Sequence, residues 1–509
     1  MDEISHLALE TIKIHKQAFI FTPSRASAEK TAEDIAKLTD FFLPELEKEI
    51  LKAASTPTSQ CRRLSHCLRK GIAFHHAGLL EAQKQLIEDE FRKGTIKIIC
   101  CTPTLAAGLS MPAFRVIIKS LKRFSGSWGM DWIPVLEYMQ MAGRAGRPEY
   151  ESHGEAITIA KDDAEQEDIY DRYVCGVPED IYSKLAVEPV LRTYLLSLIS
   201  SGIIRDQKTM KEFFAKTFWA HQFKDWAKLE RILDKMTTLL QEWQFINVEK
   251  SNDSLFVSAS HLGTPHQQKM RPTLLGKRVS ELYLDPYTAK HILDCLQNCT
   301  QIKKVFSLLQ MVCHTLEMRP LLTIKSKQQD TIQEDLVKRF DLLLEQEPSA
   351  FDSEYDEFMK SIKTALFLEA WIDEKDEDYL LETYDIRPGE IKVKLDLADW
   401  LLYAAEELAK IHHWNDQVRE VAKLRIRLKN GVKEELLPLL KLKGIGRVRA
   451  RRLFTHGIKD VGEVKKADLT TLGQILGKAV AEDIKKQVGE EIEEIPAGRR
   501  KGQLSVEKF

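Results

Sequence analysis

The sequence predicts a parallel α/β lobe at the amino end of the chain, followed by three mainly helical regions. Three observations predict this class. Short apolar strands alternate with amphipathic helices over residues 1–172, helical periodicity dominates from about residue 178, and a Gly-Ile-Gly turn joins basic helices near the carboxyl end. Alternating strands and helices give parallel sheets, and 509 residues suffice for three to four domains.

Five segments of the lobe have the pattern of buried strands, at 17–22, 71–74, 96–101, from 116 onward, and 154–160. Helices are expected between them, most clearly at 28–38 and 81–92, where apolar residues recur at helical spacing. In an open parallel sheet, ligands bind at the carboxyl ends of the strands. We therefore expect the polar motifs that follow these strands to lie together along one edge.

The composition is typical of a soluble globular chain, with 43% hydrophobic and 30% charged residues. The net charge is −2, so contact with nucleic acid must come from local basic patches. No apolar run approaches membrane-spanning length, the first residues do not resemble a signal peptide, and eight cysteines in so long a chain indicate reduced thiols. These features predict a cytoplasmic protein with no membrane segment.

Two sets of side chains have the chemistry of metal ligands: Cys61, Cys67, His75 and His76, and also His291, Cys295 and Cys299. Neither set has the paired C-x-x-C spacing of a zinc site, so no metal is predicted.

Residues 140–148, Gln-Met-Ala-Gly-Arg-Ala-Gly-Arg-Pro, have a pattern suited to phosphate chemistry. On a helix, Gln140, Arg144 and Arg147 would share one face. Two fork-shaped guanidinium groups suit the oxygens of a phosphate chain, and small residues let a ligand approach closely. The alternative is a solvated arginine-rich turn.

A second motif lies upstream, Thr-Pro-Thr-Leu-Ala-Ala-Gly at 102–108 with Met-Pro at 111–112, and Phe-His-His-Ala-Gly-Leu stands at 74–79. In this order the segments resemble motifs V and VI of superfamily-two helicases. The form of both motifs is similar to the Ski-two-like branch, and within it to archaeal DNA-repair helicases akin to the helicase domain of polymerase theta. The resemblance implies that residues 1–175 are the second RecA-like motor lobe.

The resemblance also implies roles for motif residues. Arg144 and Arg147 would stabilise the γ-phosphoryl group of ATP with its Mg²⁺, and Gly108 and Gln140 would couple nucleotide to DNA. A set of lobe residues would contact the DNA strand: Thr102, Thr104, Arg25 and His76. One departure stands at 109–110, where Leu-Ser replaces the family's usual Val-Asn.

The chain contains no G-x-x-x-x-G-K-[ST] sequence and no apolar strand ending in Asp-Glu-x-His. The phosphate cradle and the Mg²⁺ ligands of a first motor lobe are therefore expected elsewhere, either because the sequence is a fragment or because a separate first-lobe subunit supplies them. On this expectation the chain alone does not hydrolyse ATP.

Between the two motifs, residues 119–132 predict a β-hairpin with Gly-Ser turn residues flanked by aromatic and basic side chains. The resemblance implies a wedge that separates duplex DNA, with Phe124 or Trp128 stacking on the terminal base pair and Lys122 and Arg123 holding phosphates. The alternative is a surface hairpin whose aromatic residues pack on the lobe.

Residues 176–278 predict a winged helix, with helices at 181–201, 210–219 and 227–243 and strands at 245–248 and 255–258. The resemblance favours a module that braces the motor over one that binds DNA.

Residues 279–428 predict an all-α domain with a linker-like acidic segment at 345–356. Its main helix begins after Arg387-Pro388-Gly389, and the Ala398-Asp399-Trp400 string is similar to the family's ratchet helix, in which the tryptophan stacks on a base of the moving strand. A core anchor is the alternative role for Trp400. Lys392 or Lys394 replaces the family arginine on this helix.

Residues 429–490 predict a helix-hairpin-helix domain with a degenerate second copy at 469–484, and 491–509 a flexible tail. The Gly-Ile-Gly turn would present backbone N–H groups to DNA phosphates independently of base sequence. The expected phosphate-binding set is Lys443, Gly444, Gly446, Arg447, Arg449 and Arg451. The tail has a weak similarity to sliding-clamp-binding peptides.

Together these features predict the DNA-binding half of an ATP-dependent 3′→5′ DNA helicase for fork repair, acting on single-stranded and forked DNA. Two alternatives stay open at this point: a Ski-two-like RNA helicase, and a non-catalytic DNA-binding adaptor.

Overall fold

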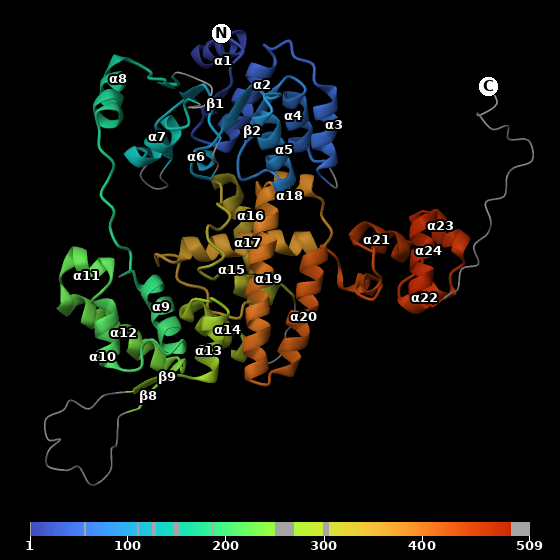
Figure 1. Cartoon of the computed structure of the whole chain (residues 1–509). Helices are drawn as coiled ribbons and strands as arrows, with labels where there is room; N and C mark the ends of the chain where they lie inside the picture. Colours follow the sequence, from blue (N-terminus) through green and yellow to red (C-terminus); the bar gives the residue numbers. More distant parts are fainter. Residues whose placement is uncertain are drawn as a thin grey trace, which may run out of the picture. The chain divides into compact units, whose positions relative to one another are not determined.

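The computed structural model describes residues 2–54, 57–108, 111–124, 129–146, 153–185, 187–249, 269–298 and 305–489 (Figure 1). Internal contacts divide the chain into two units. The first unit comprises Met1–Ser280 and Glu377–Asp396, and the second comprises Glu281–Asp376 and Leu397–Phe509. This division differs from the five segments expected from sequence, whose boundaries stay a prediction.

The first unit is built on a five-stranded sheet in the order β2-β3-β1-β4-β7, with parallel pairing throughout. Its strands are β1 Ala18–Phe21, β2 Ile72–His75, β3 Ile98–Cys101, β4 Arg115–Ile118 and β7 Glu155–Thr158. Every residue of β1, β3 and β4 is buried, which explains why these strands are apolar except for Arg115 at the start of β4, because strands covered on both faces need no polar side. Arg115 is buried as an ion pair with Glu10 and Glu155. The predicted parallel α/β lobe is confirmed.

Helices connect and cover these strands. They are α1 Glu3–Lys13, α2 Arg25–Ala36, α3 Pro44–Lys52, α4 Ser59–Leu68, α5 Glu81–Arg92, α6 Thr104–Gly108, α7 Val135–Ala142 and α8 Asp163–Ile169, the last continued by a π-helical turn at Tyr170–Val174. Ser24 turns the chain from β1 into α2, since its hydroxyl accepts a hydrogen bond from the Ser27 N–H at 3.2 Å. α2 and α4 pack on β2, while α1 and α7 contact β4.

The predicted hairpin is present as β5 Lys122–Phe124 and β6 Met130–Trp132, paired antiparallel. Its turn at 125–128 lies outside the described residues.

Further along the first unit come α9 Glu188–Ser200, α10 Gln207–Phe214, α11 Phe218–Phe223, α12 Trp226–Glu242 and α13 Leu274–Glu281, the last reaching one residue into the second unit. The single helix expected at 210–219 is two helices, because Thr217 caps a new start at Phe218. β8 Ile246–Glu249 pairs antiparallel with β9 Lys269–Pro272. The strand expected at 255–258 lies outside the described residues.

The second unit is helical. It contains α14 Pro286–Asn298, α15 Val305–Cys313, α16 Gln329–Val337, α17 Tyr355–Ile372, α20 Asn415–Asn430, α21 Arg447–Thr455, α22 Val461–Lys466, α23 Leu469–Leu476 and α24 Lys478–Gln487, with short 3₁₀ turns at Ser326–Gln328, Phe340–Leu342, Glu434–Leu436 and Leu439–Lys441. α18 Glu377–Tyr384 belongs to the first unit, and α19 Pro388–Ile411 begins in the first unit and ends in the second. The start of α19 at Pro388 confirms the predicted helix start.

A separate core holds residues 432–488 together, with Leu439, Leu453, Leu472 and Ile484 at its centre. α21 follows the Gly444–Gly446 turn, and α23 and α24 are joined through Gly477, whose φ is +91°. Two helical pairs around one core match the predicted tandem of helix-hairpin-helix units.

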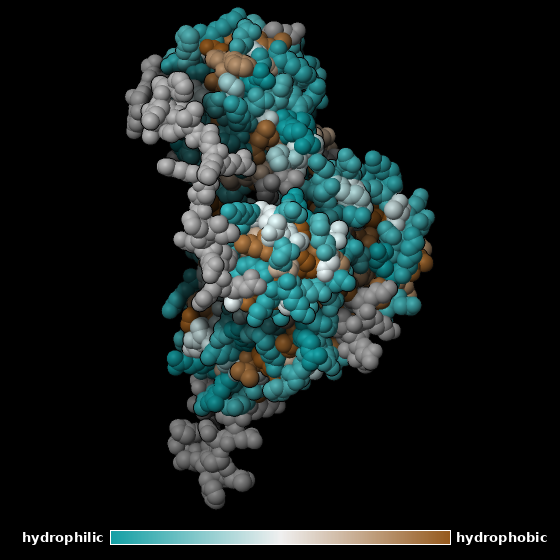
Figure 2. Space-filling view, turned by 90° about the vertical axis from the view of Figure 1, so that its right-hand side faces the viewer, coloured by the Kyte–Doolittle hydropathy of each residue, from teal (hydrophilic) through white to brown (hydrophobic). Residues whose placement is uncertain are grey.

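The surface face drawn in Figure 2 is mainly hydrophilic, with hydrophobic residues in small separate patches. Among the described residues, no helix is both long and apolar enough to cross a bilayer. The seven described cysteines are unbridged.

Candidate nucleic-acid interface and motor residues

A groove opens at the carboxyl ends of β1, β3 and β4, where the parallel-sheet rule places ligands. Its volume is about 490 Å³. Its lining comes from the turns after these strands, from the base of the hairpin and from α7: Pro23, Pro103, Thr104, Ser120, Lys122, Arg123, Ile133, Pro134, Leu136, Glu137 and Gln140. Three residues predicted from the sequence, Thr104, Arg123 and Gln140, therefore line the same groove.

The Thr-Pro-Thr turn presents two hydroxyl groups at this edge. Thr102 Oγ1 and Thr104 Oγ1 are 2.8 Å apart, both are solvent-accessible, and α6 begins at Thr104. Hydroxyl groups at the start of a short helix can donate to and accept from phosphate oxygens. Gln140 is exposed on α7 and faces the same groove.

Arg144 does not lie on a helix face. α7 ends at Ala142 and a turn follows, in which Arg144 N–H donates to Met141 O at 3.1 Å and Ala145 N–H to Ala142 O at 3.0 Å. The chain then passes beside Ala113, whose N–H donates to Arg144 O at 2.9 Å and whose carbonyl accepts from Gly146 N–H at 2.7 Å. The expectation that Gln140 and Arg144 share one helical face is therefore wrong, because the helix stops between them.

The Arg144 guanidinium is bound to motif V. Its Nε and Nη2 both donate to Ala106 O, at 3.0 and 2.6 Å, so in this structure the side chain bridges the two motifs. Arg147 lies outside the described residues, and Gly108 ends α6.

Both cationic side chains at the base of the hairpin, Lys122 and Arg123, form ion pairs with carboxylates. Arg123 Nη1 donates to Glu137 at 2.9 and 3.2 Å, and Lys122 Nζ donates to Glu165 at 2.9 Å while lying 4.1 Å above the Trp132 ring. DNA phosphates at this wall would have to replace these carboxylates. The Phe124 side chain and Trp128 lie outside the described residues.

The prediction that His76 contacts DNA is wrong, because the structure buries this side chain completely. Its Nε2 lies 3.1 Å from Oε1 of Glu29, which is itself 4% exposed. Arg63 and Arg387 also donate to Glu29, at 2.7 and 3.2 Å. Burial alone would raise the pKa of Glu29, but the hydrogen bond from His76 and the charges of Arg387 and Arg63 outweigh it and lower the pKa to about 2.

These contacts dock the first turn of α19 on the lobe. Arg25, expected to contact DNA, instead forms an ion pair with Glu390 while keeping 37% of its side chain exposed. Gly389 N–H donates to Gly78 O at 3.1 Å, and a Cβ at Gly389 would come within 2.4 Å of Leu79 O. Glycine is therefore required at this approach. The Phe-His-His-Ala-Gly-Leu segment at 74–79 therefore contacts the first turn of α19 in this structure.

Along α19, Lys392 is exposed and paired with Asp396 at 2.6 Å. Lys394 is only 6% exposed, so the expectation that it reaches DNA is wrong in this conformation: a buried ammonium cannot meet a phosphate without repacking. Trp400 is half-buried, and its Nε1–H donates to Leu282 O at 3.2 Å. That bond uses the edge of the indole and fixes its orientation.

The Gly444–Gly446 turn is held from behind by α24. Gln487 accepts from Lys443 N–H at 2.8 Å and donates to Lys443 O at 3.0 Å. Gly444 has φ +80°, and open space surrounds both glycines. No described side chain caps the amino end of α21, so this end is accessible to an anion. Arg449, exposed, donates to Gly444 O at 2.7 Å.

The other two arginines of the predicted phosphate-binding set also have protein partners. Arg451 donates to Glu374 at 2.7 and 2.6 Å and to Glu435 at 2.9 Å, and these carboxylates raise its pKa. Arg447 donates to Lys375 O at 2.6 Å and lies 5.2 Å from the Trp371 ring centre. Both carboxylates hold Arg451 in this structure, so its contact with DNA stays a prediction that requires their displacement.

Sequence reasoning missed Glu29, Arg387 and Gln487. Glu29 lies in a helix expected to be amphipathic, and only its burial distinguishes it from a surface carboxylate. No local pattern signals its partners, which stand as many as 358 residues away.

Family models match three segments of the chain. Residues 2–149 match the helicase conserved C-terminal domain, residues 306–431 match domain 4 of archaeal helicases, and residues 436–490 match the SAM-like helix-hairpin-helix tandem. The last match confirms the predicted helix-hairpin-helix domain.

Curated relatives extend over nearly the whole chain. The ATP-dependent DNA helicase Hel308 of Methanocella arvoryzae is 35% identical over 508 residues, covering 97% of this chain and 66% of the relative. Hel308 of Pyrococcus abyssi is 36% identical over 509 residues, covering 98% and 67%, and that of Pyrococcus horikoshii is 34% identical with the same coverage. This chain thus spans about two thirds of the length of these relatives. With motifs V and VI at one sheet edge and identity maintained from end to end, the chain belongs to the Hel308 family of superfamily-two helicases.

Proposed function

We propose that this chain is the DNA-binding and arginine-finger part of an ATP-dependent 3′→5′ DNA helicase acting on single-stranded and forked DNA. The observation that carries the proposal is the convergence of motif V, motif VI and the hairpin base on one groove at the carboxyl edge of the sheet. The names of the relatives support ATP and DNA as the ligands.

Catalysis on this proposal is shared between lobes. The 509 residues hold no phosphate-cradling G-x-x-x-x-G-K-[ST] sequence, so ATP and Mg²⁺ would be held mainly by a first RecA-like lobe outside this sequence. Arg144 and Arg147 would then approach the γ-phosphoryl group from this side. For Arg144 this requires release from Ala106 O, a neutral acceptor that a phosphate oxygen outcompetes because charged acceptors bind guanidinium more strongly.

The remaining parts of the chain would grip DNA. Thr102, Thr104 and Arg123 would contact the strand at the groove, the face of Trp400 would stack on a base, and the open amino end of α21 would bind a phosphate with Lys443 and Arg449 nearby. Residues 176–278 would form a winged helix that braces the motor. The indole bond to Leu282 O supports the ratchet role, since it orients the ring without using its faces.

The first test is ATP turnover by the 509-residue chain, measured with and without single-stranded DNA and an added first lobe carrying a G-x-x-x-x-G-K-[ST] sequence. The chain alone should be inactive, and the added lobe should restore DNA-stimulated turnover. Arg144→Ala should then lower kcat by about a thousandfold. Arg92→Ala is the matched control, because Arg92 is an exposed arginine of the same lobe paired with Asp89. Turnover by the chain alone would contradict the shared site.

The second test separates nucleic acids. Matched single-stranded DNA and RNA compete for the chain in a fluorescence anisotropy assay, and DNA should bind more tightly. Equal or preferential RNA binding would favour the RNA-helicase alternative. DNA binding without turnover in the presence of a functional first lobe would favour the adaptor.

A further inference from the structure

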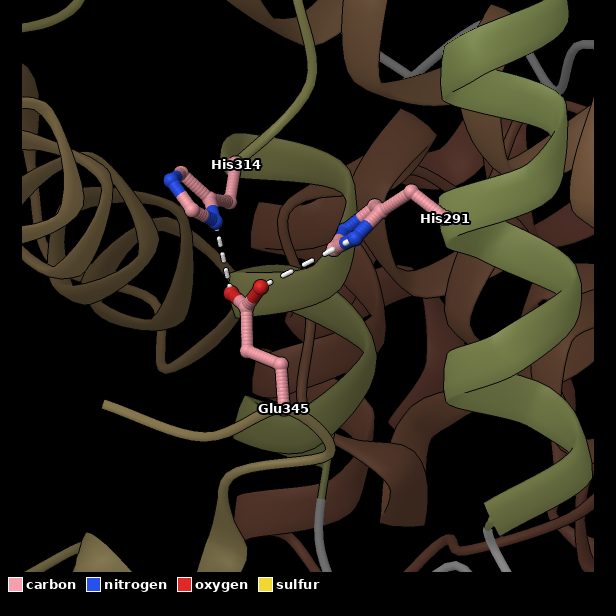
Figure 3. A group of neighbouring side chains, drawn as sticks. All are labelled: His291, His314 and Glu345. Carbon is pink, nitrogen blue, oxygen red and sulfur yellow. Dashed lines mark hydrogen bonds and ion pairs between the residues drawn. The ribbon is translucent and has the colours of Figure 1, made fainter. Parts of the chain in front are cut away.

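Three side chains from separate segments of the second unit converge on one place. His291 stands on α14, His314 directly follows α15, and Glu345 lies in the irregular segment before α17. Figure 3 shows both imidazole rings directed at the carboxylate. His314 Nδ1 is 2.8 Å from Glu345 Oε1, and His291 Nδ1 is 3.7 Å from Glu345 Oε2. Each residue offers one possible metal-ligand atom, and these three atoms all lie within 4.8 Å of one another.

A backbone carbonyl that does not belong to the cluster fixes the orientation of the His291 ring. Its Nε2 lies 3.1 Å from Met311 O. A carbonyl can only accept, so Nε2 carries the proton, and in the neutral ring Nδ1 then presents a lone pair toward Glu345. A lone pair facing a carboxylate is repulsive unless a proton or a cation lies between them. A histidine that donates its other ring N–H to a backbone carbonyl is the usual arrangement of a metal ligand.

The geometry suits a small divalent ion. With bonds of about 2.0–2.1 Å, two ligand atoms of a tetrahedral Zn²⁺ lie about 3.3 Å apart. His314 Nδ1 is 2.8 Å from Oε1 and His291 Nδ1 is 3.7 Å from Oε2, so the two histidines face different oxygens of the carboxylate, at separations on either side of that value. Two imidazoles and one carboxylate match Zn²⁺ and similar transition metals better than Mg²⁺ or Ca²⁺, which prefer all-oxygen sites.

The site is both supported and accessible. Gln310 Nε2 donates to Glu345 Oε1 at 2.5 Å, which orients the carboxylate. The side chains of His291, His314 and Glu345 are 16%, 23% and 17% exposed, so an ion can enter while the ligands stay held by packing.

We propose that His291, His314 and Glu345 bind one divalent transition-metal ion, Zn²⁺ by their donor set, with a fourth position open to water. The ion would link α14, the end of α15 and the segment before α17. The acidic segment that the sequence presents as a linker would thereby be anchored at Glu345. Because ligands distant in sequence close long loops, the metal would stabilise the helical unit.

The test uses the full chain stripped with a chelator and then titrated with Zn²⁺ by isothermal calorimetry, with metal content measured after gel filtration. The wild type should take up one equivalent at this site and unfold at a higher temperature when loaded. His314→Gln and Glu345→Gln should each weaken binding by about tenfold or more and abolish the thermal shift. His412→Gln, which alters a histidine of the same unit stacked on Trp414, should leave both unchanged. Wild-type affinity in the two ligand variants, or no uptake by the wild type, would overturn the proposal.

A second measurement does not depend on the variants folding. X-ray absorption at the zinc edge of the loaded wild type should show only nitrogen and oxygen neighbours, including imidazole scattering. Cys295 Sγ lies 3.9 Å from His291 Nδ1, so a sulfur ligand is the specific competitor. Sulfur scattering at about 2.3 Å would contradict the assigned ligand set.

Discussion

Replacing Glu29 by Gln should destabilise the first unit more than any other single carboxyl-to-amide change that leaves side-chain volume intact. The Glu29 carboxylate is 4% exposed and accepts from Arg63 and Arg387 at 2.7 and 3.2 Å, with His76 Nε2 at 3.1 Å. The amide of glutamine keeps one acceptor oxygen but places an NH₂ group against two guanidinium groups. Removing one partner of a buried ion pair costs more than the pair contributes, because the remaining charges stay desolvated.

The size of the effect follows from the pKa of Glu29. The folded value is about 2 and the ordinary value is 4.5. Each pKa unit corresponds to about 1.4 kcal/mol, so the ionised carboxylate stabilises the folded state by about 3 kcal/mol at neutral pH. This is an upper estimate for the charge itself, because Arg63 is partly exposed and can regain water.

The pH dependence has a defined sign. The pKa is lower in the folded state, so the stabilisation is complete above pH 4.5 and is lost as the pH falls from 4.5 toward 2. The difference in unfolding free energy between wild type and Glu29→Gln should therefore be constant from pH 7 to about 5 and shrink below that. Titrating groups that do not contact Glu29, such as His75, cancel in this difference.

The assay is urea unfolding followed by circular dichroism from pH 7 down to the lowest pH at which both proteins fold. Hydrogen exchange of α2 and β2 peptides assigns the loss to the first unit. Glu45→Gln is the matched control: Glu45 is 86% exposed and pairs only with Lys48 among the described contacts, so its loss should cost under about 0.5 kcal/mol. A Glu29→Gln cost equal to that of Glu45→Gln would refute the reasoning.

Four further outcomes are expected. Glu137→Gln should release Arg123 and strengthen single-stranded DNA binding about two- to fivefold, with a steeper dependence on salt, measured by anisotropy; an unchanged affinity would contradict a DNA contact at Arg123. Trp400→Phe should lower stability by about 1 kcal/mol through loss of the bond to Leu282 O yet retain DNA binding, whereas Trp400→Ala should lose both. Gly444→Ala, at φ +80°, should cost about 1 kcal/mol and weaken DNA binding, and a neutral effect would contradict the turn's role. His75, whose pKa burial lowers to about 4, should destabilise the folded state as the pH falls from 6.5 toward 4, and His75→Gln should remove that part of the slope.

The strands of the lobe were predictable because β1, β3 and β4 are buried on both faces, and such strands are mainly apolar, with Arg115 of β4 as the exception. α5 was predictable because apolar residues recur at helical spacing over 81–92, and the start of α19 because Pro388 is a local helix-start signal. The helix-hairpin-helix turn was predictable because a positive φ at Gly444 requires glycine. In each case the residues of a short stretch of sequence are enough to determine the local backbone structure.

The contacts and burial of individual side chains were less predictable, because they depend on residues far away in the sequence. His76 follows a strand as ligand-binding residues do, yet its ring contacts the buried carboxylate of Glu29, which also accepts from Arg63 and Arg387. Lys394 occupies a helix position that reads as polar, yet packing covers it. The three proposed metal ligands have no shared local spacing, so a search for paired cysteines could not find them.

The same long-range pairing bears on how the chain recognises DNA. Of the cations expected to hold phosphates, Arg123 is paired with Glu137, Arg25 with Glu390, and Arg451 with Glu374 and Glu435. Each pair that is largely exposed is worth about 0–1 kcal/mol, so a phosphate chain can displace its carboxylate at small cost, whereas the twofold pairing at Arg451 resists displacement. On the proposed function, a phosphate therefore gains little at any single one of these paired cations, and a strand that reaches several of them at once is expected to bind more tightly. Tight binding by very short oligonucleotides would be inconsistent with this arrangement.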